Sequence, residues 1–139
     1  MKLQGINHFC FSVSDLDRSI AFYEHVFGAK LLVKGRALAY FDLDGLWLAL
    51  NTENIDRSQQ ARTYTHIAFS VEEEAWDHWV ERLKEAGAEI LPGRTRDERD
   101  RKSVYFLDPD GHMFEFHTGT LQDRMQYYKA DKPHMQFFD

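Results

Sequence analysis

The sequence Asp-Pro-Asp-Gly-His-Met-Phe-Glu-Phe-His at residues 108–117 decides the fold, because it joins a tight turn to a strand that carries a carboxylate. In the turn, proline presets φ, the aspartates can bond their own backbone, and glycine tolerates positive φ. Alternation in the strand turns its two phenylalanines toward a core and puts Met113, Glu115 and His117 on the opposite face. A carboxylate in mid-strand is costly without a positive partner, which is either a metal ion or a basic side chain.

An internal repeat surrounds this strand. His-Phe-Cys-Phe-Ser-Val at residues 8–13 recurs as His-Ile-Ala-Phe-Ser-Val at residues 66–71, and both stretches alternate as strands do. An amphipathic helix follows each copy and ends at a glycine, Gly28 or Gly87. Ser14 is the expected N-cap of the first helix. Each copy therefore predicts a strand followed by a helix that covers it.

The repeat extends to the later strands, because residues 44–51 align with residues 110–117. The sequence predicts an α+β fold in which paired βαβββ modules form a single domain over residues 1–139. In each module the helix covers one face of the sheet, and the other face curls into a cup that can hold a ligand. The expected parts are module 1 at about 4–51, a polar linker at 52–63, module 2 at about 64–117 and a C-terminal tail at 118–139.

The strand alternation also predicts which side chains line the cup. His8 and His66 occupy equivalent positions of the repeat, and Glu115 lies on a neighbouring strand. Two histidines and one carboxylate form a facial set that suits a divalent ion and leaves positions open for a substrate. The alternative for each histidine is a core residue bonded to the backbone. The other cup positions are Cys10, Tyr40, Trp47, Ala49, Asn51, Ala68, Tyr105, Met113 and His117.

Composition excludes several classes of protein. A net charge of −6 argues against a nucleic-acid surface or a polybasic membrane contact. The single cysteine, Cys10, cannot form an intrachain disulfide, which suits a reducing compartment. No apolar run is long enough to span a membrane, and the first residues do not resemble a signal peptide. We therefore expect a soluble, cytoplasmic protein.

The sequence also resembles a known family. The paired His-x-x-Phe-Ser-Val strands and the strand at 108–117 resemble the vicinal oxygen chelate (glyoxalase/bleomycin-resistance) superfamily. The resemblance to its fosfomycin-resistance metallothiol transferases covers residue 5 to about residue 135 and is closest to the Gram-positive branch, which uses bacillithiol or cysteine. The stretches that carry this closer resemblance are residues 36–41, 47–51, 64–69 and 119–124.

This resemblance implies a divalent metal ion, Mn²⁺ or Mg²⁺ with Zn²⁺ and Ni²⁺ as alternatives, bound by His8, His66 and the catalytic Glu115. It also implies a homodimer with swapped modules, in which His8 comes from one subunit and the other two ligands from its partner. Fosfomycin and a low-molecular-weight thiol are the implied substrates, with the metal ion as the Lewis acid that activates the epoxide. The implied substrate contacts are Arg124, Tyr105, Tyr40 and Asn51, with Trp47 as an apolar wall and Arg94 at the border of the site.

Arg124 suits this role on chemical grounds as well. It lies in residues 120–128, which are typical of a short helix over the mouth of the cup. A guanidinium offers a forked pair of donors that matches two phosphonate oxygens. The alternative is a surface arginine paired with Asp123 or Asp131.

Arg94 and Cys10 are less certain in role. Arg94 lies in the charged stretch 92–101, and most such stretches are solvated loops. Related glutathione-using enzymes carry a potassium loop rich in lysine and serine here, so this sequence puts K⁺ dependence in doubt. Cys10 shares the cup face with His8, and we expect it to be a small, buried apolar residue beside the metal site. A metal ligand and a nucleophilic thiolate are its alternatives.

Four other functions are compatible with the same fold. A glyoxalase I-type isomerase needs four protein ligands, and Ala49 stands where a second carboxylate would be expected. A sequestering binding protein needs no metal and would leave the ligand set unexplained. An epoxide hydrolase would need a further carboxylate, for which Asp42 and Glu53 are close enough in sequence. An extradiol dioxygenase shares the ligand set, but usually in a longer chain.

Overall fold

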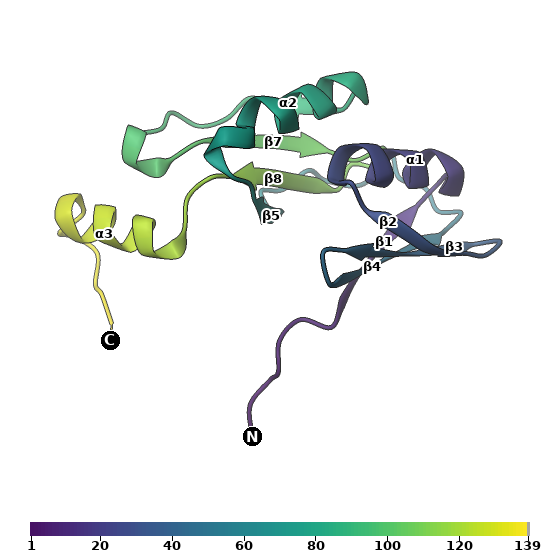
Figure 1. Ribbon diagram of the computed structural model, residues 1–139, viewed down its shortest axis with the longest axis horizontal. Helices are drawn as coiled ribbons and strands as arrows, with labels where there is room; N and C mark the ends of the chain where they lie inside the picture. Colours follow the sequence, from purple (N-terminus) through teal and green to yellow (C-terminus); the bar gives the residue numbers. More distant parts are fainter. Residues whose placement is uncertain (139) are drawn as a thin grey trace.

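Residues 1–138 are described by the computed structural model, in which two four-stranded sheets lie side by side (Figure 1). Each sheet begins with a parallel pair and continues with antiparallel pairs. This shared topology confirms the predicted α+β fold of repeated βαβββ units. The first sheet has the order β1 (His8–Val13), β4 (Leu46–Thr52), β3 (Leu38–Leu43), β2 (Lys30–Lys34), and the second has β5 (Ile67–Ser70), β8 (Met113–His117), β7 (Ser103–Leu107), β6 (Glu89–Leu91).

One helix accompanies each sheet, α1 (Leu16–Phe27) in the first and α2 (Trp76–Glu85) in the second. The predicted N-cap Ser14 is wrong, because the side chain of Asp15 accepts the hydrogen bond from the backbone nitrogen of Arg18 at 3.1 Å. Ser14 instead accepts a bond from the guanidinium of Arg18 at 2.9 Å. The predicted end is confirmed, since Gly28 has a φ of 68° and closes α1.

Several element boundaries differ from the sequence analysis. The repeat predicts strands over residues 28–32 and 87–91, but β2 and β6 begin only after the Gly-Ala pairs at 28–29 and 87–88. Thr52, which we assigned to the linker, is the last residue of β4. The C-terminal helix α3 (Leu121–Asp131) is longer than the predicted stretch and begins with a capping box at Thr120. Short 3₁₀ turns precede α2 and β7, η1 (Glu73–Ala75) and η2 (Glu98–Asp100).

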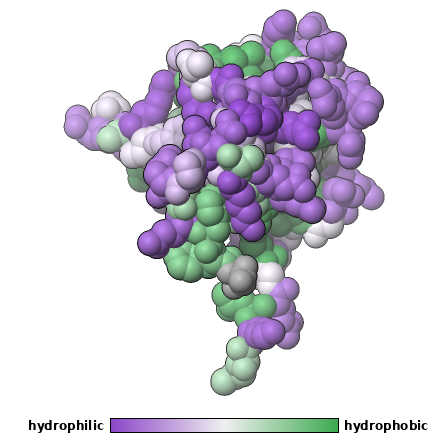
Figure 2. Space-filling view, turned by 90° about the vertical axis from the view of Figure 1, so that its left-hand side faces the viewer, coloured by the Kyte–Doolittle hydropathy of each residue, from purple (hydrophilic) through white to green (hydrophobic). Residues whose placement is uncertain are grey.

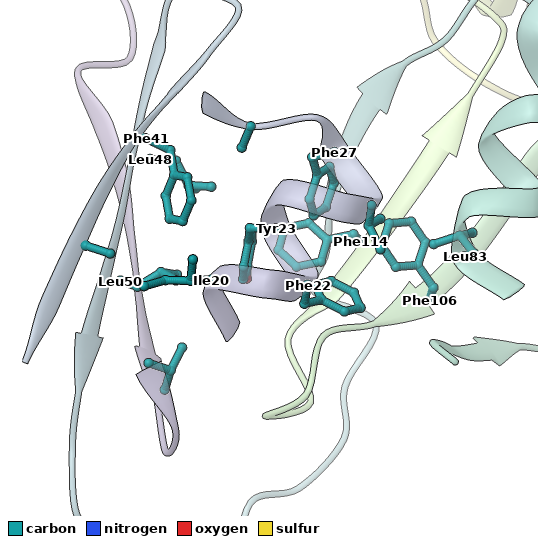
Figure 3. Packing of buried hydrophobic residues seen from close by; sticks show 14 of the residues in the cluster. Ile20, Phe22, Tyr23, Phe27, Phe41, Leu48, Leu50, Leu83, Phe106 and Phe114 are labelled. Atoms are coloured by element: carbon teal, nitrogen blue, oxygen red, sulfur yellow. The ribbon is translucent and has the colours of Figure 1, made fainter. Parts of the chain in front are cut away.

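A single aromatic core joins the two sheets, with α1 between them (Figure 3). The ring centroid of Phe27 lies 5.2 Å from that of Phe114 and 5.8 Å from that of Phe106. On the other side of α1, the ring of Tyr23 lies 6.2 Å from that of Phe41. Both sheets therefore turn their helix-covered face toward α1, and the opposite face of each sheet lies away from this core.

The turn between β7 and β8 fastens the second sheet to the start of α1. The hydroxyl of Tyr23 donates to Oδ2 of Asp108 at 2.7 Å inside the core. Burial raises the pKa of Asp108 above its ordinary value, and burial also raises the pKa of Tyr23. Asp110 accepts a bond from the backbone nitrogen of Ser14 at 3.0 Å. Within the described part of the chain, no helix is long and apolar enough to cross a membrane.

Candidate metal and substrate site

His66 and Glu115 form the centre of the candidate site. His66 directly precedes β5, whose parallel pairing with β8 places Ala68 beside Glu115. Nε2 of His66 lies 3.1 Å from Oε1 of Glu115, and the two side chains are 21% and 8% exposed. Nδ1 of His66 lies 2.6 Å from the carbonyl oxygen of Tyr64. A carbonyl only accepts, so Nδ1 carries the proton and Nε2 presents a lone pair toward the carboxylate, an arrangement that requires a proton or a metal ion between them.

His8 has the same local arrangement in the first sheet. Its Nδ1 lies 2.6 Å from Oδ1 of Asn7, so Nε2 is again left with a free lone pair. Among residues 1–138, however, no three side chains of the histidine, cysteine, aspartate and glutamate types come together as a metal site. One chain therefore brings together two of the three predicted ligands and places His8 on the other sheet.

The exposed face of the first sheet gathers the remaining predicted residues of module 1. The rings of His8 and Trp47 are 4.4 Å apart, and those of Tyr40 and Trp47 are 5.2 Å apart. Nδ2 of Asn51 donates to Sγ of Cys10 at 3.3 Å, and both residues are exposed. The expected burial of Cys10 is therefore wrong for the single chain, because its strand face is not covered. These side chains form one surface, as the strand alternation predicted.

A pocket of about 350 Å³ adjoins this surface, with Tyr40, Trp47 and Asp42 among its lining residues. Asp42 is one of the two acids that the sequence analysis kept open as a further carboxylate, and it lines this pocket. Its carboxylate already accepts a bond from the backbone nitrogen of Gly45 at 2.7 Å, which closes the turn between β3 and β4.

Tyr105 is the centre of a hydrogen-bond network beside Glu115. Its hydroxyl lies 2.7 Å from the hydroxyl of Tyr64 and accepts a bond from Nη2 of Arg96 at 2.8 Å. The same nitrogen of Arg96 lies 3.6 Å from Oε2 of Glu115. Burial raises the pKa of Tyr105, and the bond to Tyr64 raises it further, so this phenol stays protonated at neutral pH.

Sequence reasoning missed both Arg96 and Tyr64. Arg96 lies in the irregular stretch between β6 and η2, where no periodicity shows which arginine points inward. Tyr64 precedes β5 and follows no strand pattern either, although its spacing of two residues from His66 is the signal that could have found it.

Ser103 is a third residue that the sequence analysis did not select. Its hydroxyl bonds to Oε2 of Glu115 and lies 2.6 Å from Nδ1 of His117. Burial lowers the pKa of His117, which favours its neutral form. The alternation of β7 places Ser103 on the same face as Tyr105, so this residue could have been found from the sequence.

Asp100 in η2 holds the two arginines that the resemblance implied as substrate contacts. Nη1 of Arg94 donates to this carboxylate at 3.2 Å, and Nε of Arg124 lies 3.6 Å from it. The bond from Arg94 lowers the pKa of Asp100, which is only 4% exposed. Arg124 is therefore paired with Asp100, and the alternative pairing with Asp123 or Asp131 is wrong. The molecular surface at the α3 end is mostly hydrophilic (Figure 2).

The predicted site residues thus fall into two groups on two sheets. The second sheet and its loops carry a histidine–carboxylate pair, a protonated phenol and three guanidinium groups, which suits a small anionic ligand beside a metal ion. The first group is His8, Cys10, Tyr40, Trp47 and Asn51, and the second is His66, Glu115, Tyr105, Arg94 and Arg124, joined by Arg96, Tyr64 and Ser103.

Several curated proteins are similar to this chain over nearly its whole length. Metallothiol transferase FosB of Lysinibacillus sphaericus is 62% identical over 140 residues, which cover 100% of this chain and 99% of that protein. Metallothiol transferase FosB of Bacillus licheniformis is 55% identical over 139 residues, covering 99% of this chain and 90% of that protein. Residues 5–116 also match the family model described as the Glyoxalase/Bleomycin resistance protein/Dioxygenase superfamily.

Solved structures of fosfomycin resistance proteins share this fold. A mutant of the fosfomycin resistance protein FosX from Listeria monocytogenes, complexed with Mn(II) and 1S,2S-dihydroxypropylphosphonic acid, matches with a TM-score of 0.82. It is 37% identical, and the match covers 91% of this chain and 99% of that one. FosX from Mesorhizobium loti matches with a TM-score of 0.77 at 35% identity, over 89% of this chain and 99% of that one. This chain therefore belongs to the glyoxalase/bleomycin resistance protein/dioxygenase superfamily and, within it, to the metal-dependent metallothiol transferase family.

Proposed function

We propose that this chain is an enzyme that inactivates fosfomycin by adding a low-molecular-weight thiol, bacillithiol or cysteine, to the epoxide, and so confers resistance in the cytoplasm. The observation that carries the proposal is the matched state of the two repeat histidines. In both His8 and His66, Nδ1 is held by an oxygen acceptor, which leaves Nε2 to bind a metal ion, and Nε2 of His66 faces Glu115. This is the form in which an imidazole binds a metal ion.

His8, His66 and Glu115 would hold a divalent ion. The carboxylate and the open positions suit Mn²⁺ or Mg²⁺, while the two imidazoles also allow Zn²⁺ or Ni²⁺. When bound, the metal ion supplies a Lewis acid that polarises the C–O bond of the epoxide.

The other residues would bind and orient the phosphonate. Arg94 and Arg124 share the single carboxylate of Asp100, so this cluster keeps a net positive charge for an incoming anion. Tyr105 offers a protonated phenol close to Glu115, and Asn51 offers an amide donor from the first sheet. Trp47 would supply an apolar wall against the carbon skeleton of the substrate, and Tyr40, whose ring lies 5.2 Å from that of Trp47, would offer its hydroxyl to the phosphonate.

Two subunits would complete each site. Within one chain, His8 lies on an exposed sheet face and does not meet the pair of His66 and Glu115. We therefore propose a homodimer of swapped modules, in which the first sheet of one subunit covers the second sheet of the other. A closed C₂ dimer of this kind forms two equivalent sites.

An epoxide hydrolase is the second candidate, because FosX proteins share the fold and Asp42 lines the pocket beside Tyr40 and Trp47. Two observations favour the transferase. The sequence is 62% identical to a FosB protein and 37% identical to the FosX mutant. In addition, the carboxylate of Asp42 is engaged by the turn at Gly45.

The test is a comparison of products. The protein is loaded with Mn²⁺ and incubated with fosfomycin and bacillithiol, cysteine, glutathione or no thiol, and products are identified by mass spectrometry. A thiol adduct supports the transferase, a diol formed without thiol identifies the hydrolase, and tight binding without product identifies a sequestering protein. Glu115→Ala should abolish turnover, whereas Glu81→Ala, an exposed glutamate of α2, is the matched control.

A further inference from the structure

Ser103 occupies a position that controls how Glu115 is oriented. In the antiparallel pair of β7 and β8, Ser103 lies opposite His117 and Tyr105 lies opposite Glu115. The hydroxyl of Ser103 therefore reaches Glu115 diagonally across the strands while it also lies 2.6 Å from Nδ1 of His117. Glu115 is 8% exposed on its side chain, so water has little access to replace these bonds.

The two oxygens of Glu115 have different partners. Oε1 faces Nε2 of His66 at 3.1 Å. Oε2 accepts from Ser103 and lies 3.6 Å from Arg96 and 3.5 Å from Nδ1 of His117. These contacts fix the rotation of the carboxylate. Oε2 is held by Ser103 of β7, and Oε1 is left to face His66.

Proton balance gives the direction of these bonds. An ionised carboxylate only accepts, so the single hydroxyl proton of Ser103 goes to Glu115. The serine oxygen then accepts the proton on Nδ1 of His117. Two consecutive hydrogen bonds result: His117 donates to Ser103, and Ser103 donates to Glu115.

The absence of a side chain at Gly119 leaves space for the imidazole of His117. A Cβ atom at Gly119 would lie 2.8 Å from Nε2 of His117 and 2.8 Å from Cγ of Arg101. Any other residue would displace the imidazole, so the backbone after β8 is adapted to the position of His117.

We propose that Ser103 is a positioning residue whose hydroxyl, supported by His117, holds Glu115 so that its free oxygen and Nε2 of His66 converge on the metal ion. The inference rests on the proposed metal site and adds the group that sets its geometry. Outer hydrogen-bond partners of metal-binding carboxylates typically change metal affinity by roughly 10- to 100-fold.

The experiment measures the Kd of Mn²⁺ for the metal-free protein by calorimetry, together with the thermal midpoint of each variant. Ser103→Ala should raise the Kd roughly 10- to 100-fold while the metal-free protein still unfolds in one cooperative thermal transition, and Ser103→Thr, which keeps the hydroxyl, should stay within about threefold of wild type. Ser70→Ala is the matched control, because Ser70 is exposed and lies beside His117 on the other side of β8. If Ser103→Ala does not fold, Ser103→Cys replaces it, since a thiol of similar size is a weak donor and should show the same loss.

A wild-type Kd in Ser103→Ala would overturn the inference, and so would a loss in Ser103→Thr as large as that in Ser103→Ala. Glu115→Ala separates this failure from a failure of the proposed function. If Glu115→Ala loses Mn²⁺ binding and Ser103→Ala does not, only the positioning role is refuted. If Glu115→Ala binds Mn²⁺ as the wild type does, the metal site itself is refuted, and this inference with it.

Discussion

Two inactive variants of this protein should restore each other's activity when their subunits mix. His8→Ala removes the proposed metal ligand on the first sheet, and Glu115→Ala removes a proposed ligand on the second. Each homodimer then lacks a ligand at both of its sites and should be inactive. In a mixed dimer of swapped modules, one site receives both defects and the other receives none.

The size of the recovery follows from the symmetry of the dimer. Random exchange of equal amounts makes about half of all dimers mixed, and each mixed dimer has one complete site out of two, so about a quarter of all sites should be active. The recovered rate should therefore be about a quarter of the wild-type rate at the same total concentration.

A second mixture provides the matched control. His66 and Glu115 lie on the same sheet, 3.1 Å apart, so mixing His66→Ala with Glu115→Ala leaves no complete site in any dimer. The assay is formation of the thiol adduct of fosfomycin after exchange has been verified by native mass spectrometry. Activity absent from the first mixture despite verified exchange would refute sites shared between subunits. Activity in the second mixture would refute the assignment of His66 and Glu115 of one subunit to the same site.

Three further predictions concern the substrate contacts and the core. Arg124→Ala should raise the KM for fosfomycin by a factor equivalent to roughly 1.5–3 kcal/mol and leave the Kd of Mn²⁺ unchanged, with poor rescue by lysine; an unchanged KM contradicts the phosphonate contact. Tyr23→Phe should lower the free energy of unfolding by roughly 1.5–3 kcal/mol at neutral pH, because Tyr23 donates to the buried carboxylate of Asp108. Burial raises the folded-state pKa of Asp108 above its ordinary value, and the bond from Tyr23 lowers it, so the substitution raises this pKa further. The cost should be full where Asp108 is ionised in both proteins and should shrink as the pH falls through the raised folded-state pKa; an equal cost in urea unfolding at neutral and at acidic pH contradicts the argument. Cys10→Ser should keep most of kcat, whereas a loss of more than about a hundredfold with metal still bound would show that the thiol takes part in the reaction.

Strand alternation carried most of the information that the sequence offered about the fold. The period of two placed the phenylalanines of β8 in the core, where Phe114 and Phe116 are each 1% exposed, and placed Glu115 on the opposite face. The repeat also predicted the topology, because both copies encode the same order of strand types. The N-cap error is of a different kind, since Ser14 and Asp15 are both suitable capping residues and only the backbone decides between them.

The parts that could not be predicted lie where no period applies. Arg96 reaches Tyr105 from the loop after β6, and a loop gives no rule for which of its arginines turns inward. The position of α1 between the two sheets could not be predicted either. An apolar stripe indicates that a helix is buried on one face, but it does not indicate whether one sheet or two sheets cover it.

That shared core has a consequence for function. The aromatic side chains around Phe27 bury the helix-facing sides of both sheets, so the cohesion of the chain does not depend on the two cup faces. The exposed first-sheet face carries His8, and Trp47 on it is 40% exposed, although a large aromatic side chain gains free energy when it is buried. Burial of this face against the second sheet of another subunit would bring that gain and the third ligand together. In the proposed dimer, folding of one chain and completion of its site are separate steps. Substitutions on the first-sheet face should therefore change association and metal binding more than they change the stability of the folded subunit.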